Sequence, residues 1–146
     1  MLNESSTIAA ISTAKGVGGI GVVRVSGKRA LEIAKNICKV ELSPRKVEFT
    51  SFKDKKNVTL DQGIVIYFPS PSSFTGEDIV EFQGHGGPIV VSTLIQTCVE
   101  MGAKMARPGE FSERAFLNDK MDLVQLEGVA DLIASASEQA AKSALG

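Results

Sequence analysis

Residues 20–38 read IGVVRVSGKRALEIAKNIC, and the spacing of the apolar residues changes within this stretch. Its first part is a β-branched run, which predicts a strand. Apolar residues then recur at helical spacing, which predicts an amphipathic helix over about 28–39 with Ser26 or Gly27 as its N-cap. A second β-branched run, residues 7–13, precedes this stretch across a glycine-rich turn. The chain is therefore expected to open with two strands and a helix.

The rest of the chain continues this mixture of strands and helices. Further strands are predicted at 47–54, 62–68, 78–83 and 104–106, and further helices after Pro88, over 111–117 and from Asp122 onward. Pro88 suits the first turn of its helix, and Gly102 is placed to end that helix in a left-handed cap. The order favours a mixed α+β fold over a doubly wound parallel sheet. Two similar β-rich halves, each with one helix, are an open alternative.

The sequence of the final segment predicts one helix whose apolar face is too narrow to form a core on its own. Asp122 and Gln125 form a predicted capping box at its start. One face is lined by Leu123, Leu126, Ala130 and Ile133. Beyond that face the residues are small and polar, without an apolar stripe wide enough for a core. We expect one main domain over 1–119, and we interpret 120–146 as the first helix of a helical domain whose partners lie outside the chain.

Composition restricts the function classes. The chain has 146 residues, of which 43 % are hydrophobic, and 16 Lys and Arg against 17 Asp and Glu give a net charge of −1. This describes one ordinary globular domain and argues against bulk electrostatic binding of nucleic acid. No signal peptide or membrane span is evident, so a cytoplasmic location is expected. Cys38 and Cys98 lack the spacing of a zinc site, and we predict two buried free thiols and no metal site.

A glycine cluster imitates a nucleotide-binding motif. Residues 16–21 read GVGGIG and match G-x-G-x-x-G, which requires a helix to start at its last glycine. The next residues are the strand formers Val22 to Val25, so we reject a nucleotide-binding interpretation. Either a tight glycine turn or a loop that lets a ligand approach closely would explain the cluster, and both remain open.

The second glycine cluster contains the only histidine. Residues 84–87 read GHGG and resemble part of a hydrolase oxyanion loop, but the chain has no G-x-S-x-G nucleophile motif. With a single histidine, His85, neither a catalytic triad nor a multi-histidine metal site can form. A hydrogen-bonded loop residue is the default interpretation of His85, although the junction of a strand and a helix is a reasonable ligand-binding edge.

Several charged residues have an ordinary interpretation beside a functional one. Arg24 lies between Val23 and Val25, so it faces the opposite side of its strand, where a solvated position is the default. Glu81 likewise faces away from its apolar neighbours. A helical corner holds Arg107, Glu110, Glu113, Arg114, Asp119 and Lys120. We expect these six to form exposed ion pairs that add little stability, and a phosphate-contact surface of Arg107, Arg114 and Lys120 is the weaker alternative.

Three long strings resemble a known family. They are GVGGIGVVRVSG at 16–27, SFTGEDIVEFQGHGGP at 73–88 and RPGEFSERAFLNDKMDL at 107–123. Together they resemble the N-terminal domain of the tRNA-modification GTPases of the MnmE or TrmE family. The resemblance spans essentially the whole chain, and the third string alone is long enough to be highly specific.

The resemblance implies a fold and a ligand. The family domain is similar to the folate-binding domain of the glycine-cleavage aminomethyltransferases and binds a tetrahydrofolate of the 5-formyl type. Family contacts to the folate would fall on Arg24, Glu81 and Lys120, with Gly19, Gly21, His85 and Arg107 as secondary candidates. A carboxylate can accept two hydrogen bonds from the amino-pyrimidine edge of a pterin, and Arg or Lys can pair with the glutamate tail or polarise ligand carbonyls.

The resemblance also implies partners. The family enzyme forms a homodimer through this domain and, with an FAD-containing partner called MnmG or GidA, modifies C5 of the wobble uridine of certain tRNAs. By this comparison the chain is expected to be a fragment without catalytic residues of its own. GTP, Mg²⁺ and K⁺ would belong to a GTPase domain that these residues do not contain, and tRNA would bind through the full complex.

Two other function classes stay open at this stage. One is a self-standing one-carbon transferase of the related folate fold, with Glu81 as a general base. The other is a pure assembly scaffold, in which strand edges and the last helix bind a partner and the glycine loops are only turns.

Overall fold

The computed structural model describes residues 6–12, 19–85 and 87–145. Its strands are β1 (Ile8–Ile11), β2 (Ile20–Ser26), β3 (Glu48–Lys53), β4 (Thr59–Phe68), β5 (Ile79–His85) and β6 (Lys104–Met105). Its helices are α1 (Ala30–Cys38), α2 (Pro88–Glu100), α3 (Glu110–Leu117) and α4 (Leu123–Leu145). The predicted order of elements is confirmed.

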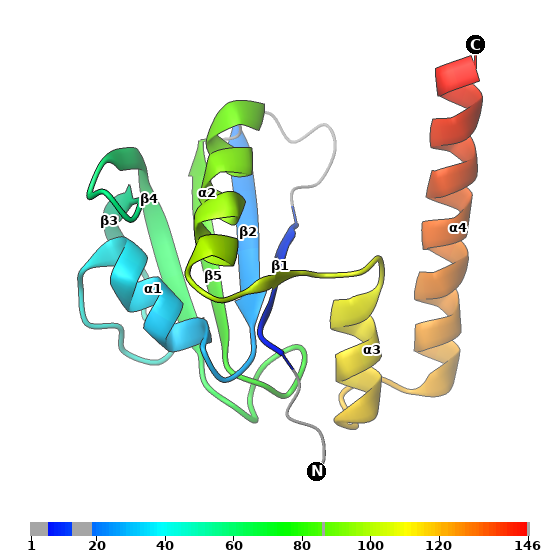
Figure 1. The fold of residues 1–146 in the computed structure, drawn as a ribbon. Coiled ribbons are helices and arrows are strands. Elements are labelled where there is room, and N and C mark those ends of the chain that lie inside the picture. The colour runs from blue at the N-terminus through cyan, green and yellow to red at the C-terminus, as the bar shows by residue number, and fades with distance from the viewer. Residues whose placement is uncertain (1–5, 13–18, 86, 146) are drawn as a thin grey trace.

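All the strands join in one mixed sheet. Their order across it is β3-β4-β5-β2-β1-β6. Neighbouring strands are antiparallel, except that β6 runs parallel to β1. Helices α1 and α2 cover one face, whereas α3 and α4 stand beside the edge that β1 and β6 form (Figure 1). Helices segregated from a largely antiparallel sheet define the α+β class, as predicted.

The core lies between the sheet and the helices α1 and α2. Val23 and Val25 on β2 are fully buried, as are Val80 and Phe82 on β5. Phe52 of β3 packs edge-on against Phe82, with ring centroids 5.4 Å apart. Because side chains alternate along a strand, the residues between these positions point to the opposite face of the sheet. Neither α1 nor α2 covers that second face (Figure 1).

The predicted N-cap of α1 is wrong. The helix begins at Ala30, and its cap residue Arg29 makes no side-chain cap bond. The amide of Arg29 instead donates to the hydroxyl of Thr7 at 3.0 Å. Gly27 has a φ of 137°, and a Cβ there would lie 2.6 Å from the Cα of Thr7. Gly27 is therefore required for the close approach of β1, and a residue distant in sequence satisfies the first turn.

The ends of α2 follow the sequence signals. Pro88 occupies the first turn of the helix, and the helix ends at Glu100. Gly102 then adopts a φ of 119°, a backbone conformation that favours glycine. Both predictions are confirmed, so the glycine cluster before α2 leads directly from the end of β5 into a helix.

Both cysteines are buried and free, as predicted. Burial raises the pKa of Cys38 to about 12 and the pKa of Cys98 to about 12. Because the thiolate is the reactive form of cysteine, these two residues are packing residues of α1 and α2.

The helix α4 stands apart from the sheet and lies against α3 (Figure 1). The predicted capping box is present: the amide of Asp122 donates to Gln125 at 2.9 Å, and the amide of Gln125 donates to Asp122 at 2.8 Å. The half-buried face consists of Leu126, Val129 and Ile133. Leu123 and Ala130, which the sequence placed on that face, are exposed, because α3 is too short to cover a wider stripe. Among the described residues no helix is both long and apolar enough to span a membrane.

Candidate functional site

An ion pair lies on the second face of the sheet, away from α1 and α2. Arg24 on β2 and Glu81 on β5 are direct partners in the antiparallel pairing. The Nε atom of Arg24 donates to Oε2 of Glu81 at 2.8 Å. The Arg24 side chain is 38 % exposed and that of Glu81 is 13 % exposed. The predicted facing of both residues is confirmed, but they are paired with each other rather than separately solvated.

A third residue fixes the Glu81 carboxylate. The side-chain amide of Gln83 donates to Oε1 of Glu81 at 2.6 Å. Each oxygen of the carboxylate therefore has one donor within the sheet and keeps acceptor capacity for a further donor. The sequence interpretation missed Gln83, although it stands two residues after Glu81 and the alternation of the strand places it on the same face.

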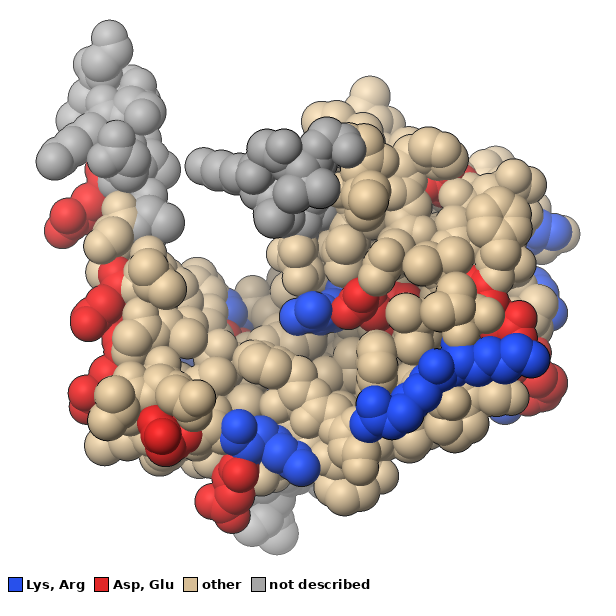
Figure 2. All heavy atoms as spheres, turned by 180° about the vertical axis from the view of Figure 1, so that it is seen from behind, with Lys and Arg blue, Asp and Glu red and all other residues tan. Residues whose placement is uncertain are grey.

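Apolar side chains border this polar centre. Val22 of β2 pairs with Gln83, and on the other side Ile64 and Ile66 of β4 pair with Gln83 and Glu81. All three apolar residues are half-buried. Figure 2 shows the molecule from this side, where uncharged atoms cover most of the surface and a hollow separates α4 from the sheet. This face thus combines a fixed carboxylate with apolar surface on which a flat ring can rest.

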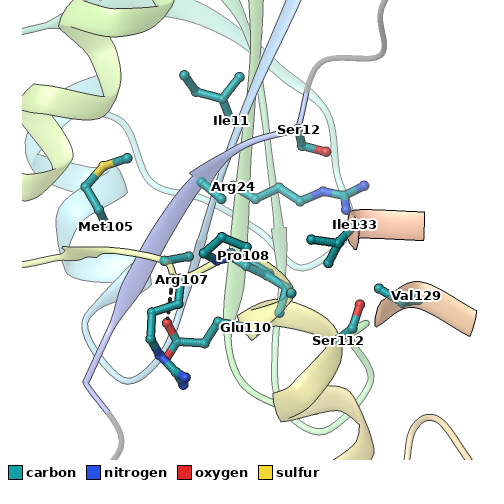
Figure 3. A pocket seen from close by; sticks show the side chains of 14 residues that line it. Ile11, Ser12, Arg24, Met105, Arg107, Pro108, Glu110, Ser112, Val129 and Ile133 are labelled. Atoms are coloured by element: carbon teal, nitrogen blue, oxygen red, sulfur yellow. Dashed lines mark hydrogen bonds and ion pairs between the residues drawn. The ribbon is translucent and has the colours of Figure 1, made fainter. Parts of the chain in front are cut away.

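A cavity of about 480 Å³ lies next to the ion pair, between the edge of the sheet and the helices α3 and α4. Arg24 extends into it from β2, and Val129 and Ile133 of α4 close the opposite side (Figure 3). Met105 and Phe111 add apolar lining. Arg24 therefore belongs both to this cavity and to the pair with Glu81.

Arg107 lies at the rim of the same cavity, but its charge is used elsewhere. Its guanidinium lies 2.9 Å from Glu113 and 3.4 Å from Glu110. These hydrogen bonds, first that with Glu113, raise the pKa of Arg107. Figure 3 shows the side chain turned down toward Glu110. The prediction of exposed ion pairs at this corner is confirmed for Arg107.

The same prediction is wrong for Arg114. Its side chain is only 8 % exposed and lies 3.0 Å from Glu77, whose side chain is 17 % exposed. The Glu77 carboxylate also accepts from the hydroxyl of Ser26 at 2.8 Å, and that hydroxyl lies 2.8 Å from Thr75. This buried network joins α3 to the end of β2 and to the loop before β5. Arg114 therefore fixes the corner of the fold and is not available to phosphate.

Lys120 lies on the turn between α3 and α4, away from the cavity that holds Arg24. It lines another hollow of about 640 Å³, together with residues such as Phe116 and Met121. A Cβ built on Gly76 would lie 3.6 Å from its Cε, so Lys120 stands next to the loop before β5. The structure thus brings Arg24 and Glu81 together and places Lys120 separately, beyond the start of β5.

Gly19 and Gly21, which the resemblance gives as secondary candidates, lie at the start of β2. Gly19 has a φ of 86°, and Gly21 pairs with Gly84 across β2 and β5. Residues 16–18 of the first glycine cluster fall outside the described residues. A strand starts at Ile20, so the helix that a nucleotide-binding motif requires is replaced by β2, which supports the rejection of that motif.

His85 ends β5 and is held by a carboxylate. Its Nδ1 lies 2.6 Å from Oδ1 of Asp61, and its backbone amide donates to Oδ2 at 2.8 Å. The Asp61 side chain is 9 % exposed, whereas that of His85 is 77 % exposed. Burial alone would raise the pKa of Asp61, but hydrogen bonds from the ring and amide of His85 and from the amide of Gln62 outweigh it, and the net effect is a lowered pKa.

This lowered pKa gives a pH dependence of stability. The ionised Asp61 stabilises the fold above the unfolded value of about pH 4, and the contribution is lost as the pH falls through the lower folded value. An Asp61→Asn variant should be about 1 kcal/mol less stable than the original chain near neutral pH. The difference should shrink below about pH 4, as measured by urea unfolding. An Asp131→Asn variant, altered on the exposed side of α4, serves as the control. A difference that stays constant through acidification would contradict the assignment.

The fold and this face define the class of the protein: an α+β domain with α1 and α2 on one side of its sheet and the paired Arg24 and Glu81 on the other. The family model of the "GTP-binding protein TrmE N-terminus" matches residues 7–120. The chain therefore belongs to the TrmE family and represents the N-terminal domain of its members, as the sequence resemblance predicted.

Individual relatives agree with this family. The chain is 56 % identical over 145 residues to the tRNA modification GTPase MnmE of Ectopseudomonas mendocina, covering 99 % of the chain and 32 % of that protein. It is 59 % identical over 139 residues to the protein of the same name from Pseudomonas fluorescens, covering 95 % of the chain and 30 % of the relative. The Saccharophagus degradans protein is 56 % identical over 141 residues, which are 97 % of the chain and 31 % of the relative. The chain thus spans about a third of the length of these relatives.

Proposed function

We propose that this chain is the tetrahydrofolate-binding and homodimerisation module of a tRNA-modification GTPase, with a ligand of the 5-formyltetrahydrofolate type. The observation that carries this proposal is the Arg24–Glu81 pair, a half-buried ion pair on the sheet face that neither α1 nor α2 covers. It contributes nothing to the apolar core between the sheet and α1 and α2. A charged pair in such a position is better explained by a ligand than by the stability of the fold.

The chemistry of the pair suits a reduced pterin. Oε1 and Oε2 of Glu81 are each oriented by one donor, so the carboxylate presents its remaining lone pairs to the ring N–H and amino group of an amino-pyrimidine edge. Arg24 lies beside it and would polarise the neighbouring ring carbonyl. Val22, Ile64 and Ile66 offer apolar contact to the faces of the pterin ring. Lys120 would approach the pterin end of the ligand from beyond the start of β5.

The bare face also supports the proposed homodimer. A sheet face with apolar side chains such as Ile20 and Phe49 exposed is a surface that a second copy of the chain can cover. The proposed dimer would enclose the ligand, which in a single chain lies on an open surface. The relatives' name extends the proposal to a whole protein that modifies tRNA and hydrolyses GTP. The family resemblance adds the finer parts of the proposal: Mg²⁺ and K⁺ with GTP in a GTPase domain, a cytoplasmic location, an FAD-containing MnmG-type partner, and modification of C5 of the wobble uridine.

The test is isothermal titration of the 146-residue chain with 5-formyltetrahydrofolate, and with GTP and NAD as controls for the glycine motif. Saturable heat with the folate alone is expected, because the chain has the carboxylate for a pterin and a strand where a nucleotide motif needs its helix. The Arg24→Ala variant should bind the folate about tenfold more weakly, since one charge-assisted contact is lost. Binding of GTP or NAD, or a folded dimer that binds no folate, would refute the proposal.

A further inference from the structure

Lysines and arginines are unevenly distributed along the chain. Residues 28–56 contain 9 Lys and Arg against 4 Asp and Glu, whereas residues 57–146 contain 5 against 12. The first segment forms α1, β3 and the turn into β4, which lie at one side of the molecule, and α3 and α4 lie at the other (Figure 1). The net charge of −1 therefore combines a basic side with an acidic side, so a local surface for a polyanion is compatible with it.

Two adjoining hollows lie on this basic side, on the face of the sheet that α1 and α2 cover. Their volumes are about 490 and 700 Å³, and both are lined by Asp54, Lys55 and Glu100. Their further polar lining includes Asn36, Lys39, Lys56, Ser92, Thr93 and Gln96. We call the two hollows together the lysine groove. It lies on the opposite side of the sheet from the pair of Arg24 and Glu81.

The three lysines of this groove have no carboxylate partners. Lys39, Lys55 and Lys56 are exposed, and within the part of the chain that the structure describes none of their side chains forms an ion pair. By contrast, Lys35 on α1 lies 3.3 Å from Glu41. Neighbouring lysines without carboxylate partners leave a positive potential that an anion can neutralise.

The backbone holds these lysines in place. Lys39 has a φ of 59° at the C-cap of α1. The Asp54 carboxylate accepts from the amide of Lys56 at 2.8 Å and from the amide of Val58 at 2.9 Å. Asp54 therefore fixes the β3–β4 turn through its backbone and does not pair with the ammonium groups. Lys55 and Lys56 thus stand on a turn whose shape is set before any partner binds.

The remaining lining favours an RNA backbone over a protein. Ser92 and Gln96 are exposed polar residues of α2, and such groups commonly bond to phosphate and ribose oxygens. No aromatic ring lines the described groove, and Met101 is its apolar residue of any size. Protein interfaces rely on buried aromatic and aliphatic anchors, and base recognition in single strands relies on aromatic stacking. The groove has neither feature, which leaves contact with phosphates.

We infer that the lysine groove contacts the phosphate backbone of RNA, and that the tRNA on which the whole protein acts lies against it. This inference rests on the proposed function, from which it takes tRNA as the substrate, and adds the surface of this domain that meets it. Because the groove and the folate site lie on opposite sides of the sheet, the two ligands can be bound together. Contacts to phosphates carry no sequence information, so the groove positions the RNA and does not select it.

The experiment measures binding of a fluorescently labelled, unmodified tRNA transcript to the 146-residue chain by anisotropy over a series of salt concentrations. The groove variant is Lys55→Gln/Lys56→Gln. The matched control is Lys46→Gln/Lys104→Gln, which removes the same charge from two exposed lysines outside the groove. Melting curves and titration with 5-formyltetrahydrofolate show that each variant keeps its fold and its other site.

The groove variant should bind the tRNA about tenfold more weakly at about 50 mM salt. The slope of log K against log salt should fall by about 1.5, because two phosphate contacts are lost. Lys55→Arg/Lys56→Arg keeps both charges and should bind as the original chain does. Glu100→Gln removes a carboxylate from the lining and should strengthen binding about twofold. The control should change the affinity less than about twofold.

Three results would overturn the inference: no tRNA binding by the original chain at low salt, an unchanged affinity in the groove variant, or an equal loss in the control. Groove-dependent binding of a polyglutamate peptide in place of tRNA would assign the surface to an acidic protein and would also overturn it. Each of these results leaves folate binding to be judged by its own titration. Groove-dependent tRNA binding by a chain that binds no folate would support the groove and refute the folate site.

Discussion

Replacing Arg114 by alanine is expected to lower the free energy of unfolding by about 3 kcal/mol, the cost of breaking a buried ion pair on one side. The guanidinium lies 3.0 and 3.3 Å from the two oxygens of Glu77 and 3.4 Å from Glu110. Among the described residues, its removal leaves the largely buried carboxylate of Glu77 with only the hydroxyl of Ser26 as a side-chain partner. Urea unfolding at neutral pH measures the change.

The matched control is Arg107→Ala at the same corner. Arg107 also pairs with two carboxylates, but its side chain is 65 % exposed, so its loss should cost no more than about 0.5 kcal/mol. If the two variants are destabilised equally, the contacts of Arg114 do not hold α3 against the loop before β5.

The second large effect concerns the ligand. The Glu81→Gln variant should bind 5-formyltetrahydrofolate about 100-fold more weakly, because the carboxylate charge and one of its two acceptor oxygens at the pterin edge are lost. Glutamine also turns one acceptor oxygen into a donor, which then faces either the ligand's amino group or the Nε of Arg24. Titration calorimetry measures the affinity, and the melting temperature should change little because the residue lies outside the core.

Glu32→Gln is the control for this change. Glu32 is an exposed carboxylate on α1, on the opposite side of the sheet, so its variant should bind the folate as the original chain does. An unchanged affinity in Glu81→Gln would remove Glu81 from the site and with it the geometry proposed for the pterin.

Most of the helices and strands that the sequence predicts correctly are marked by local patterns. The change from strand to helical spacing gave β2 and α1, and the Asp122–Gln125 pair marked the start of α4. Features of the fold that depend on residues distant in sequence were not predicted. Thr7 satisfies the first turn of α1, and only the approach of β1 brings it there. Arg114 was expected to be exposed, because its partner Glu77 lies 37 residues away in sequence.

The same distinction applies to the site. Alternation along a strand was enough to place Arg24 and Glu81 opposite their buried neighbours, and applied once more it would have found Gln83. That the two charges meet at 2.8 Å depends on the register of β2 against β5, which no local pattern encodes. The Asp61 contact to His85 likewise joins β4 to β5, two strands that no local pattern brings together. Lys120 was grouped with Arg24 by resemblance alone, and the fold sets it apart.

The most direct test of the ligand's location is an amide chemical-shift map of the chain as 5-formyltetrahydrofolate is added. The largest shifts are expected at Glu81 and Gln83 on β5 and at Arg24 on β2, with smaller shifts at the facing part of β4. Shifts confined to the groove between the β3–β4 turn and α2, around Lys55 and Thr93, would place the ligand away from Arg24 and Glu81 and would contradict the proposed site. An unchanged spectrum at saturating ligand would contradict folate binding by this domain altogether.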